Sequence, residues 1–326
     1  MNAFMHHKQP VLGVSSCLLG MNVRYDGSGK QHSFISSILD KYFELLPICP
    51  EVAIGMGVPR APIQLRILDD QLHAVEVGNH AQDVTLDLQA YGQQQATQAH
   101  TFCGYIFKSS SPSCGISDST IFSEHADHTG PGIYTREILH ALPCLPVIDE
   151  RQLDRKEAKD NFMERVFAQV RWNQILTGPM TVKLLIGFHM THHLTLSAHC
   201  EKSHEALSAS LSGLHDPLSR DAINNYLKQF HAGLRVPLTH DDHVRMLTKL
   251  QRCLSTIISS GETGKLDTEI RKYMESSDSL VTSLQLIKEL ADAYNLYHLS
   301  RQTYINPIPA EIALRFSTQQ EKSYDH

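Results

Sequence analysis

An alternation of short apolar runs and helix-like segments in the first half of the chain restricts the fold most. Three apolar runs have the length of a strand: VLGVSS, FCGYIFK and LPVID, at residues 11–16, 102–108 and 145–149. After the first run, apolar residues recur at helical spacing from Phe34 to Leu46. Pro47 is expected to end that helix before Ile48 leads into a further strand. This order predicts an α/β domain with a mainly parallel sheet flanked by helices. Such sheets bind ligands beyond the carboxyl ends of their strands.

The second half of the sequence predicts helices only. Apolar residues recur at helical spacing in four stripes, at residues 162–170, 182–189, 247–258 and 284–294. Thr239, followed three residues later by Asp242, matches a capping box at a helix start. A length of 326 residues suits two domains. We therefore expect an α/β domain over residues 1–155 and an all-α domain over residues 156–326.

Composition and charge are those of an ordinary soluble protein. Hydrophobic residues make up 41% and charged residues 20% of the chain. The net charge of −6 argues against a dedicated binder of long nucleic acid or of an anionic membrane. Apolar stretches such as Leu184–Phe188 are far shorter than a membrane-spanning helix, and the first residues lack the apolar core of a signal peptide. We expect a cytoplasmic protein.

Three of the seven cysteines follow expected strands. The chain has no CxxC pair, which excludes the usual zinc knuckle and the thioredoxin motif. Cys17, Cys49 and Cys114 stand among Pro, Gly and Ser, whereas Cys103 has apolar neighbours. In a parallel sheet the three thiols would lie at one edge. They are either small buried hydrophobes or the ligands of a shared metal or cluster site.

The residues around these cysteines resemble the TudS thiouracil desulfidase family. The similarity covers nearly all of residues 10–150, in order, and its blocks are SSCLLG with RYDG (15–20 and 24–27), CPE with Pro59-Arg60 (49–51), SPSCG after Lys108 (111–115) and PVIDE (146–150). Members of that family hold a [4Fe-4S] cluster by three cysteines and remove sulfur from thiolated uracil compounds without net redox change. The resemblance implies that Cys17, Cys49 and Cys114 are the ligands here, and that Glu51 and Ser111 are catalytic, with Ser113 as a second serine candidate.

Three thiolate ligands leave one iron of a cluster open, and an open iron has affinity for the soft sulfur of a thione. Glu51 would deprotonate the attacking water, and a serine would carry a proton to the ring nitrogen. The plain alternatives are a solvated carboxylate at Glu51 and a turn hydroxyl at Ser111. Three nearby cations would bind a nucleotide phosphate or form surface ion pairs, and they are Arg24, Arg60 and Lys108.

The helical half resembles a second family, which includes the YbgA protein and has no established chemistry. The resemblance rests on Gly187-Phe188-His189, the histidine-rich helix that follows, and Asn306-Pro307-Ile308-Pro309 before Glu311. We expect this half to cover the substrate cleft or to mediate oligomerisation. His189, His192 and His193 share a helix face but lack the HExxH arrangement of a zinc site, so a metal there is not favoured. Cys144 is expected to be structural, although its position leaves a place near the cluster open.

The sequence thus predicts a desulfidase for small thiolated pyrimidines, with 4-thiouridine monophosphate or 2-thiouracil as substrate. Two alternatives stay open. The first is removal of sulfur from thiolated tRNA, which the acidic net charge disfavours. The second is a regulatory or interaction protein in which the cysteines hold a metal without catalysis. It is disfavoured by the glutamate and serines beside the cysteines and by the lack of a basic recognition helix.

Overall fold

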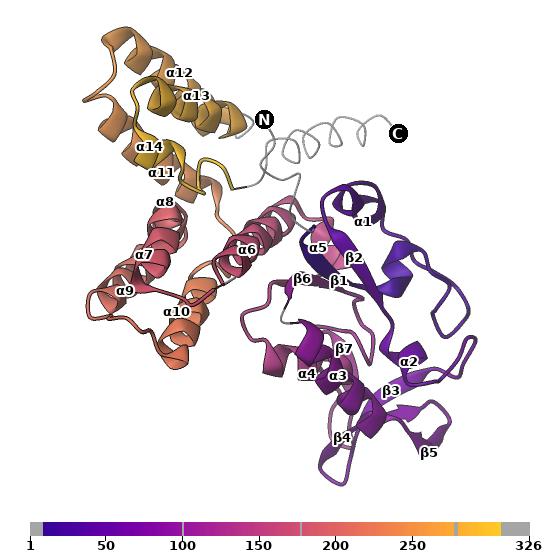
Figure 1. The fold of residues 1–326 in the computed structure, drawn as a ribbon. Coiled ribbons are helices and arrows are strands. Elements are labelled where there is room, and N and C mark those ends of the chain that lie inside the picture. Colours follow the sequence, from indigo (N-terminus) through magenta and orange to yellow (C-terminus); the bar gives the residue numbers. More distant parts are fainter. Residues whose placement is uncertain (1–8, 100, 177, 277–279, 308–326) are drawn as a thin grey trace. The chain divides into compact units, whose positions relative to one another are not determined.

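The computed structural model describes residues 9–99, 101–176, 178–276 and 280–307 (Figure 1). The chain divides into two compact units, Met1–Phe162 and Met163–His326, and helix α6 (Lys156–Ile175) spans the division. The first unit is α/β and the described part of the second contains helices but no strand, which confirms the expected fold class. No helix in the described ranges combines the length and apolar content needed to cross a membrane.

A four-stranded parallel sheet forms the centre of the first unit. Its strands stand in the order β2-β1-β6-β9, and their bounds are Val11–Ser15 (β1), Glu44–Ile48 (β2), Phe102–Phe107 (β6) and Val147–Asp149 (β9). All six residues of β6 are buried, as expected for a strand covered on both faces. Strands β1 and β6 approach closely at Gly13, where a Cβ atom would lie 2.4 Å from the Tyr105 ring. The sheet confirms the predicted strand order along the chain.

The prediction of a single helix from Phe34 to Leu46 is wrong in its second half. The helical part consists of α1 (Ser33–Ser37) and the 3-10 turn η2 (Leu39–Lys41), and β2 begins at Glu44. Pro47 therefore lies inside a strand, paired in register with Val14 of β1. Because β2 is an edge strand, a missing N–H can be tolerated there.

A second, five-stranded sheet was not predicted from the sequence. Its order is β5-β4-β3-β7-β8, and the bounds are Ile63–Leu68 (β3), Gln71–Glu76 (β4), Asn79–Asp83 (β5), Ser119–Phe122 (β7) and His128–Gly130 (β8). Every residue of β5 is exposed, so that strand carries no apolar pattern. The turn between β3 and β4 is made by Asp69 and Asp70, both in the left-handed region with φ of 48° and 60°. The pair Asp69-Asp70, which suits a tight turn, was the sequence feature that could have indicated this hairpin.

Two helices of the first unit, α3 (Thr85–Ala99) and α4 (Ile133–Ala141), lie side by side (Figure 1). They meet closely at Gly92, where a Cβ would lie 2.7 Å from the Cβ of Glu137. The Gln-rich segment over residues 89–100 falls largely within α3, consistent with a helix face. Tyr134 of α4 packs against Tyr105 and Phe107 of β6, whose rings stack 3.8 Å apart. This aromatic core supports the sheet beside its carboxyl edge.

The second unit packs helices around two apolar cores. One core contains Trp172 of α6 and residues of α7, α9 and α10, and the other is built mainly from α11, α12 and α13. The bounds of the helices after α6 are Val182–Thr191 (α7), His193–His199 (α8), Glu201–Leu211 (α9), Arg220–Gly233 (α10), His240–Leu254 (α11), Ser260–Ser276 (α12), Leu280–Ala293 (α13) and Tyr297–Ser300 (α14).

Most of the predicted helix features in this unit are confirmed. Thr239 and Asp242 form the capping box of α11, with each side chain accepting from the other residue's backbone N–H. The stripe at residues 162–170 is buried. In α7, Leu185 is buried but Ile186 is 40% exposed, because neighbouring residues of a helix point about 100° apart. Residues Ile308, Pro309 and Glu311 of the YbgA-like tail lie outside the described residues.

Candidate functional site

The three predicted cysteines line one cavity at the carboxyl edge of the parallel sheet. Cys17 lies in the 3-10 turn η1 (Ser16–Leu19) directly after β1, and Cys49 directly follows β2. Cys114 lies on the loop after β6, and the cavity has a volume of about 310 Å³. Its walls also include Arg24, Glu51, Arg60, Lys108 and Ser111. Parallel strands thus bring together residues that are almost a hundred positions apart.

Cys17 and Cys114 are buried, Cys49 is half-buried, and the three thiols act on one another electrostatically. Burial raises the pKa of Cys17 to about 11 and that of Cys114 well above its usual value, and the pKa of Cys49 is also raised by burial. Repulsion from Cys49 adds to the increase at both other cysteines. Ser15 works in the opposite direction, because its hydrogen bond to Cys114 stabilises the thiolate. Without a bound cation the thiols are therefore protonated at neutral pH.

The possible metal ligands of the cavity are thiols. Cys17 and Cys114 are buried, Cys49 is half-buried, and all three line the cavity, whose lining has no fourth cysteine. Cysteine thiolates are the usual ligands of iron–sulfur clusters, so the chemistry of these residues fits such a group. Within the described ranges, no group of three or more His, Cys, Asp or Glu side chains is arranged to hold a single metal ion.

Glu51 is held at both carboxylate oxygens. It lies on α2 (Pro50–Ala53), the short helix that starts directly after Cys49. Arg60 donates to Oε2 from Nε at 2.8 Å and from Nη2 at 2.5 Å, while Ser113 Oγ donates to Oε1 at 2.9 Å. These contacts fix the plane of the carboxylate beside Cys49. The expected alternative of a solvated loop carboxylate does not match this arrangement.

The two serine candidates have different contacts. Ser111 lines the cavity, and its Oγ accepts from the backbone N–H of Ser113 at 3.3 Å and of Cys114 at 3.1 Å. Its hydroxyl therefore shapes the loop that carries Cys114. Ser113 is fully buried and donates to Glu51. Of the two hydroxyls, Ser113 is the one bonded to Glu51, and Ser111 is the one that lines the cavity.

Two of the three predicted substrate-binding cations are occupied by other protein groups. Besides its pair with Glu51, Arg60 donates from Nη1 to the carbonyls of Val23 at 3.0 Å and Gly57 at 2.9 Å. Lys108 Nζ donates to Glu150 Oε1 at 2.6 Å, and to the carbonyl and hydroxyl of Ser109 at 2.8 and 2.9 Å. Three acceptors satisfy the three N–H groups of an ammonium. Arg60 and Lys108 therefore stabilise the walls of the cavity.

Arg24 differs from the other two cations. Its Nη1 donates to Ser28 Oγ at 2.9 Å and lies 3.6 Å from Asp26 Oδ2. Its side chain is 33% exposed, compared with 5% for Arg60. Next to it, Tyr25 also lines the cavity and is 44% exposed. Arg24 therefore keeps donors available at the cavity.

Glu150 is a site residue whose importance the sequence did not reveal. It directly follows β9, at the same edge of the sheet as the cysteines, and it is only 4% exposed. Burial alone would raise its pKa, but hydrogen bonds from Lys108 and from the backbone and hydroxyl of Ser109 hold that pKa below its usual value. A carboxylate directly after a parallel strand was the available signal.

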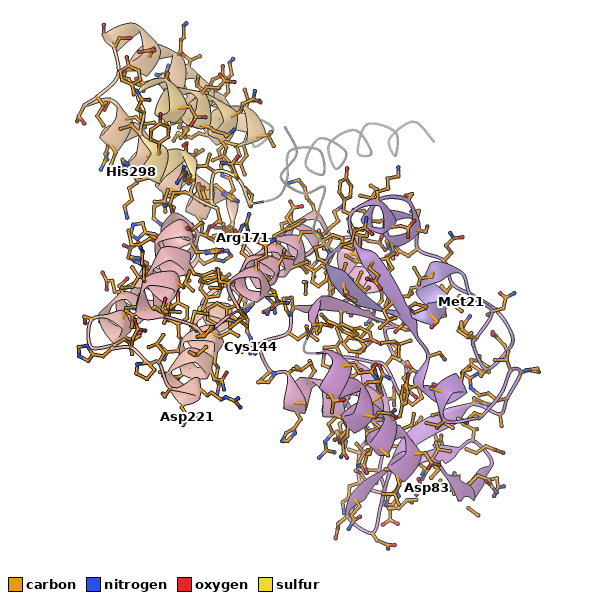
Figure 2. The ribbon with its side chains drawn as sticks, in the orientation of Figure 1. Met21, Asp83, Cys144, Arg171, Asp221 and His298 are labelled. Atoms are coloured by element: carbon orange, nitrogen blue, oxygen red, sulfur yellow. The ribbon has the colours of Figure 1, made fainter. Side chains whose placement is uncertain are left out.

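Two other candidates are not part of the cavity lining. Cys144, labelled in Figure 2, precedes β9 and so stands at the amino edge of the sheet, and it is absent from the cavity lining. In the second unit, His189 is buried, with Nδ1 3.1 Å from Tyr226 Oη and Nε2 3.0 Å from Ser208 Oγ. Its pKa is lowered to about 4, chiefly by burial. A neutral histidine with both nitrogens bonded within the protein fits a structural role.

Comparisons with known proteins give two separate matches along the chain. Residues 12–150 match the family model described as 2-thiouracil desulfurase, and residues 193–309 match a protein family of unknown function, DUF1722. The uncharacterised protein YbgA of Escherichia coli K12 is 26% identical over 162 residues, which cover 48% of this chain and 94% of YbgA. A solved structure of the [4Fe-4S]-dependent thiouracil desulfidase TudS is 29% identical, covers 45% of this chain and 94% of its own, and superposes with a TM-score of 0.36.

These matches confirm both resemblances that the sequence motifs indicated. Residues 12–150 are similar to the 2-thiouracil desulfurase family and residues 193–309 to DUF1722, and the chain is also similar to YbgA.

Proposed function

We propose that the protein is a [4Fe-4S]-dependent desulfidase that hydrolyses the C=S bond of small thiolated uracil derivatives. The observation that carries this proposal is the cavity lined by three cysteines together with a glutamate that is held at both carboxylate oxygens. The match of residues 12–150 to the desulfurase family supports the substrate class. We also propose a reducing, cytoplasmic location, because an odd number of cysteines in a chain of this length does not suit a disulfide framework. We also retain the proposed division into domains of residues 1–155 and 156–326.

Cys17, Cys49 and Cys114 would hold the cluster, which when bound supplies an open iron that takes the thione sulfur and polarises the C=S bond. The side chains of the protein position the attacking water and accept its proton. Glu51 accepts a proton from water at Oε1, while Arg60 keeps the carboxylate plane fixed through Oε2. The water oxygen bonds to the ring carbon, the C–S bond breaks, and the sulfur leaves as hydrosulfide, so a C=O group replaces C=S with no change of oxidation state.

Ser113 and Ser111 have different roles in this reaction. Ser113 donates to the oxygen of Glu51 that receives the proton, so it relays or steadies that proton. Ser111 faces the cavity and is the hydroxyl available to the ring nitrogen of the substrate. If Glu51→Gln and Ser111→Ala variants both release sulfide at the wild-type rate, these roles are wrong. We expect Glu51→Gln to reduce kcat by about 10²-fold or more.

The first measurement is iron and acid-labile sulfide per chain after anaerobic reconstitution. Nearly equal amounts that approach four of each would support the proposal. Sulfide release is then measured with 2-thiouracil, 4-thiouracil, 4-thiouridine monophosphate and thiolated tRNA. Activity on tRNA alone would favour the tRNA alternative. Bound zinc with little iron would contradict the desulfidase and favour a regulatory protein.

The contribution of the helical unit is tested with the same assays. We propose that it covers the substrate cleft or mediates oligomerisation, as expected from its sequence. A chain truncated after residue 159 is compared with the full chain for substrate preference and for mass by light scattering. Unchanged substrate preference together with an unchanged oligomeric state would exclude both roles.

A further inference from the structure

The loop between β6 and β7 begins with a backbone conformation that is unusual for its residue type. Ser110 has a φ of 55°, in the left-handed region, where a side chain with a Cβ atom is disfavoured. The other described non-glycine residues with a positive φ are Asp69, Asp70 and Asn295. Asp and Asn visit this region because their short polar side chains bond to the nearby backbone. Ser110 is therefore an outlier that the surrounding structure must hold in place, and such outliers cluster at functional sites.

Asp118 holds both polar groups of Ser110. One carboxylate oxygen, Oδ2, accepts from the backbone N–H of Ser110 at 2.7 Å and from its hydroxyl at 2.8 Å. The same oxygen forms an ion pair with Arg151 of α5 (Glu150–Leu153). Asp118 directly precedes β7, and α5 directly follows β9. One carboxylate thus ties the start of the loop to the beginning of β7 and, through Arg151, to the end of β9.

The residue after Asp118 fixes the middle of the loop. Ser119 Oγ donates to the carbonyl of Ser111 at 2.7 Å, and the N–H of Gly115 donates to that carbonyl at 2.8 Å. Gly115 packs so closely that a Cβ there would overlap Ser119 Oγ and lie 3.1 Å from Asp118 Oδ1. The pair Asp118-Ser119 therefore packs against the residues that precede and follow Cys114.

Asp118 does not line the cavity, whereas Ser110, Ser111 and Cys114 do. The plain alternative for Asp118 is a surface ion pair with Arg151, whose side chain is 55% exposed, and such pairs contribute little to stability. That alternative does not account for the two hydrogen bonds to Ser110 or for its positive φ. These contacts indicate that Asp118 controls the shape of the loop.

We propose that Asp118 is a positioning residue, which holds Ser110 in the left-handed conformation and thereby places Cys114 at the cavity. Without Asp118, Ser110 relaxes to a negative φ, and the direction of the chain that follows it changes. Cys114 and Ser111 then move relative to the other two cysteines, which are fixed at the ends of β1 and β2. This inference rests on the proposed function where it assigns Cys114 to a cluster and Ser111 to the substrate, whereas the contacts that hold the loop do not depend on it.

The first test uses the metal-free full-length protein and needs no activity. Cys114 is 6% exposed, so it should react slowly with iodoacetamide, and Asp118→Ala should raise its alkylation rate about tenfold because the loop opens. Cys103 of β6, which is 3% exposed, is the internal reference, since only global unfolding would expose it. Mass spectrometry of the two cysteine peptides gives both rates. Equal Cys114 rates in the wild type and the variant would overturn the proposal.

The second test uses the reconstituted protein. Asp118→Ala should lose iron to EDTA about tenfold faster and lower kcat per bound cluster about tenfold, an effect typical of residues that orient metal ligands. Asp127→Ala is the matched control and should behave as the wild type does, because Asp127 also accepts from a serine backbone N–H, that of Ser123 at 3.2 Å, but lies outside the loop. A wild type that binds no cluster would contradict the proposed function, and the alkylation rate of Cys114 would still decide the role of Asp118.

A rescue variant separates positioning from a general loss of stability. Glycine takes a positive φ as readily as a negative one, so adding Ser110→Gly to Asp118→Ala should return the alkylation rate and kcat to within about threefold of the wild type. Arg151→Met removes the ion pair but keeps the bonds to Ser110, so its effect should stay below about threefold. The proposal is wrong if the double variant behaves as Asp118→Ala does, or if Arg151→Met reproduces the full effect of Asp118→Ala.

Discussion

The cysteine cavity of the first unit and two buried histidines of the second unit differ in how their polar groups are partnered. In the cavity, Glu51 is paired with Arg60 and Glu150 with Lys108, so the charges balance within the protein. In the helical unit, His192 Nε2 and both ring nitrogens of His231 have no hydrogen-bond partner among the described residues. Burial lowers the pKa of both histidines to about 3, so neither carries a charge at neutral pH. The cavity thus pairs its charges, whereas the helical unit avoids charge at these two positions.

This difference separates two kinds of functional residue. The ion pairs of the cavity position other groups, so removing one partner should disturb geometry and stability together. The thiols of the cavity differ from these ion pairs, because their raised pKa values keep them protonated unless a metal binds. Variants in the two regions should therefore have independent effects.

The largest effect is expected from the cysteines. Cys114→Ser should lose most of the iron and reduce sulfide release by about 10³-fold or more, because two thiolates cannot hold the cluster in place. Iron content, the visible absorption of the cluster and sulfide release are measured together. Cys253→Ser, at an exposed position in α11, is the control and should keep both iron and activity. A Cys114→Ser protein with full iron would contradict the assignment of Cys114 as a ligand.

The second effect concerns the pair of Glu51 and Arg60. Arg60→Met should destabilise the protein by about 3 kcal/mol, because it leaves a largely buried carboxylate without its cation. We also expect kcat to fall while KM for a free thiopyrimidine base stays within about twofold, since Arg60 acts on the substrate only through Glu51. Urea unfolding and steady-state kinetics measure the two quantities. A raised KM with unchanged kcat would instead make Arg60 a substrate-binding residue, as the sequence suggested.

The third effect is a pH dependence of the helical unit. The pKa of His231 falls from 6.5 to about 3 on folding, so its contribution is complete above pH 6.5 and is lost as the pH falls toward 3. Between pH 7 and pH 4, this residue should lower the free energy of unfolding of the wild type by on the order of 3 kcal/mol. His231→Leu should lose much less over the same range, as measured by urea unfolding. If wild type and variant show the same pH slope, the side chain is not buried in its neutral form.

The sequence revealed the strands of the parallel sheet and the three cysteines because one local pattern carries both. An apolar run that ends in a Cys beside Pro, Gly or Ser indicates a strand end with a polar edge. It did not reveal the second sheet, whose β5 is polar throughout, or the end of the first helix, where Leu45 and Leu46 fit helical and strand spacing equally. The partners of Glu51 and Lys108 were also hidden. They come from segments that lie 9 and 42 positions away, and only the fold brings them together.

The smallest effect tests Arg24, the cavity cation that keeps free donors. We expect Arg24→Met to lower kcat/KM for 4-thiouridine monophosphate about tenfold, equivalent to about 1.4 kcal/mol, while leaving kcat/KM for 4-thiouracil unchanged. The ratio of the two values isolates the phosphate contact, because both substrates share the reacting C=S bond. Arg136→Met is a matched control, since Arg136 is exposed on α4 and does not line the cavity. Equal losses on both substrates would mean that Arg24 supports the cavity wall through Ser28 and Asp26 and does not read the phosphate.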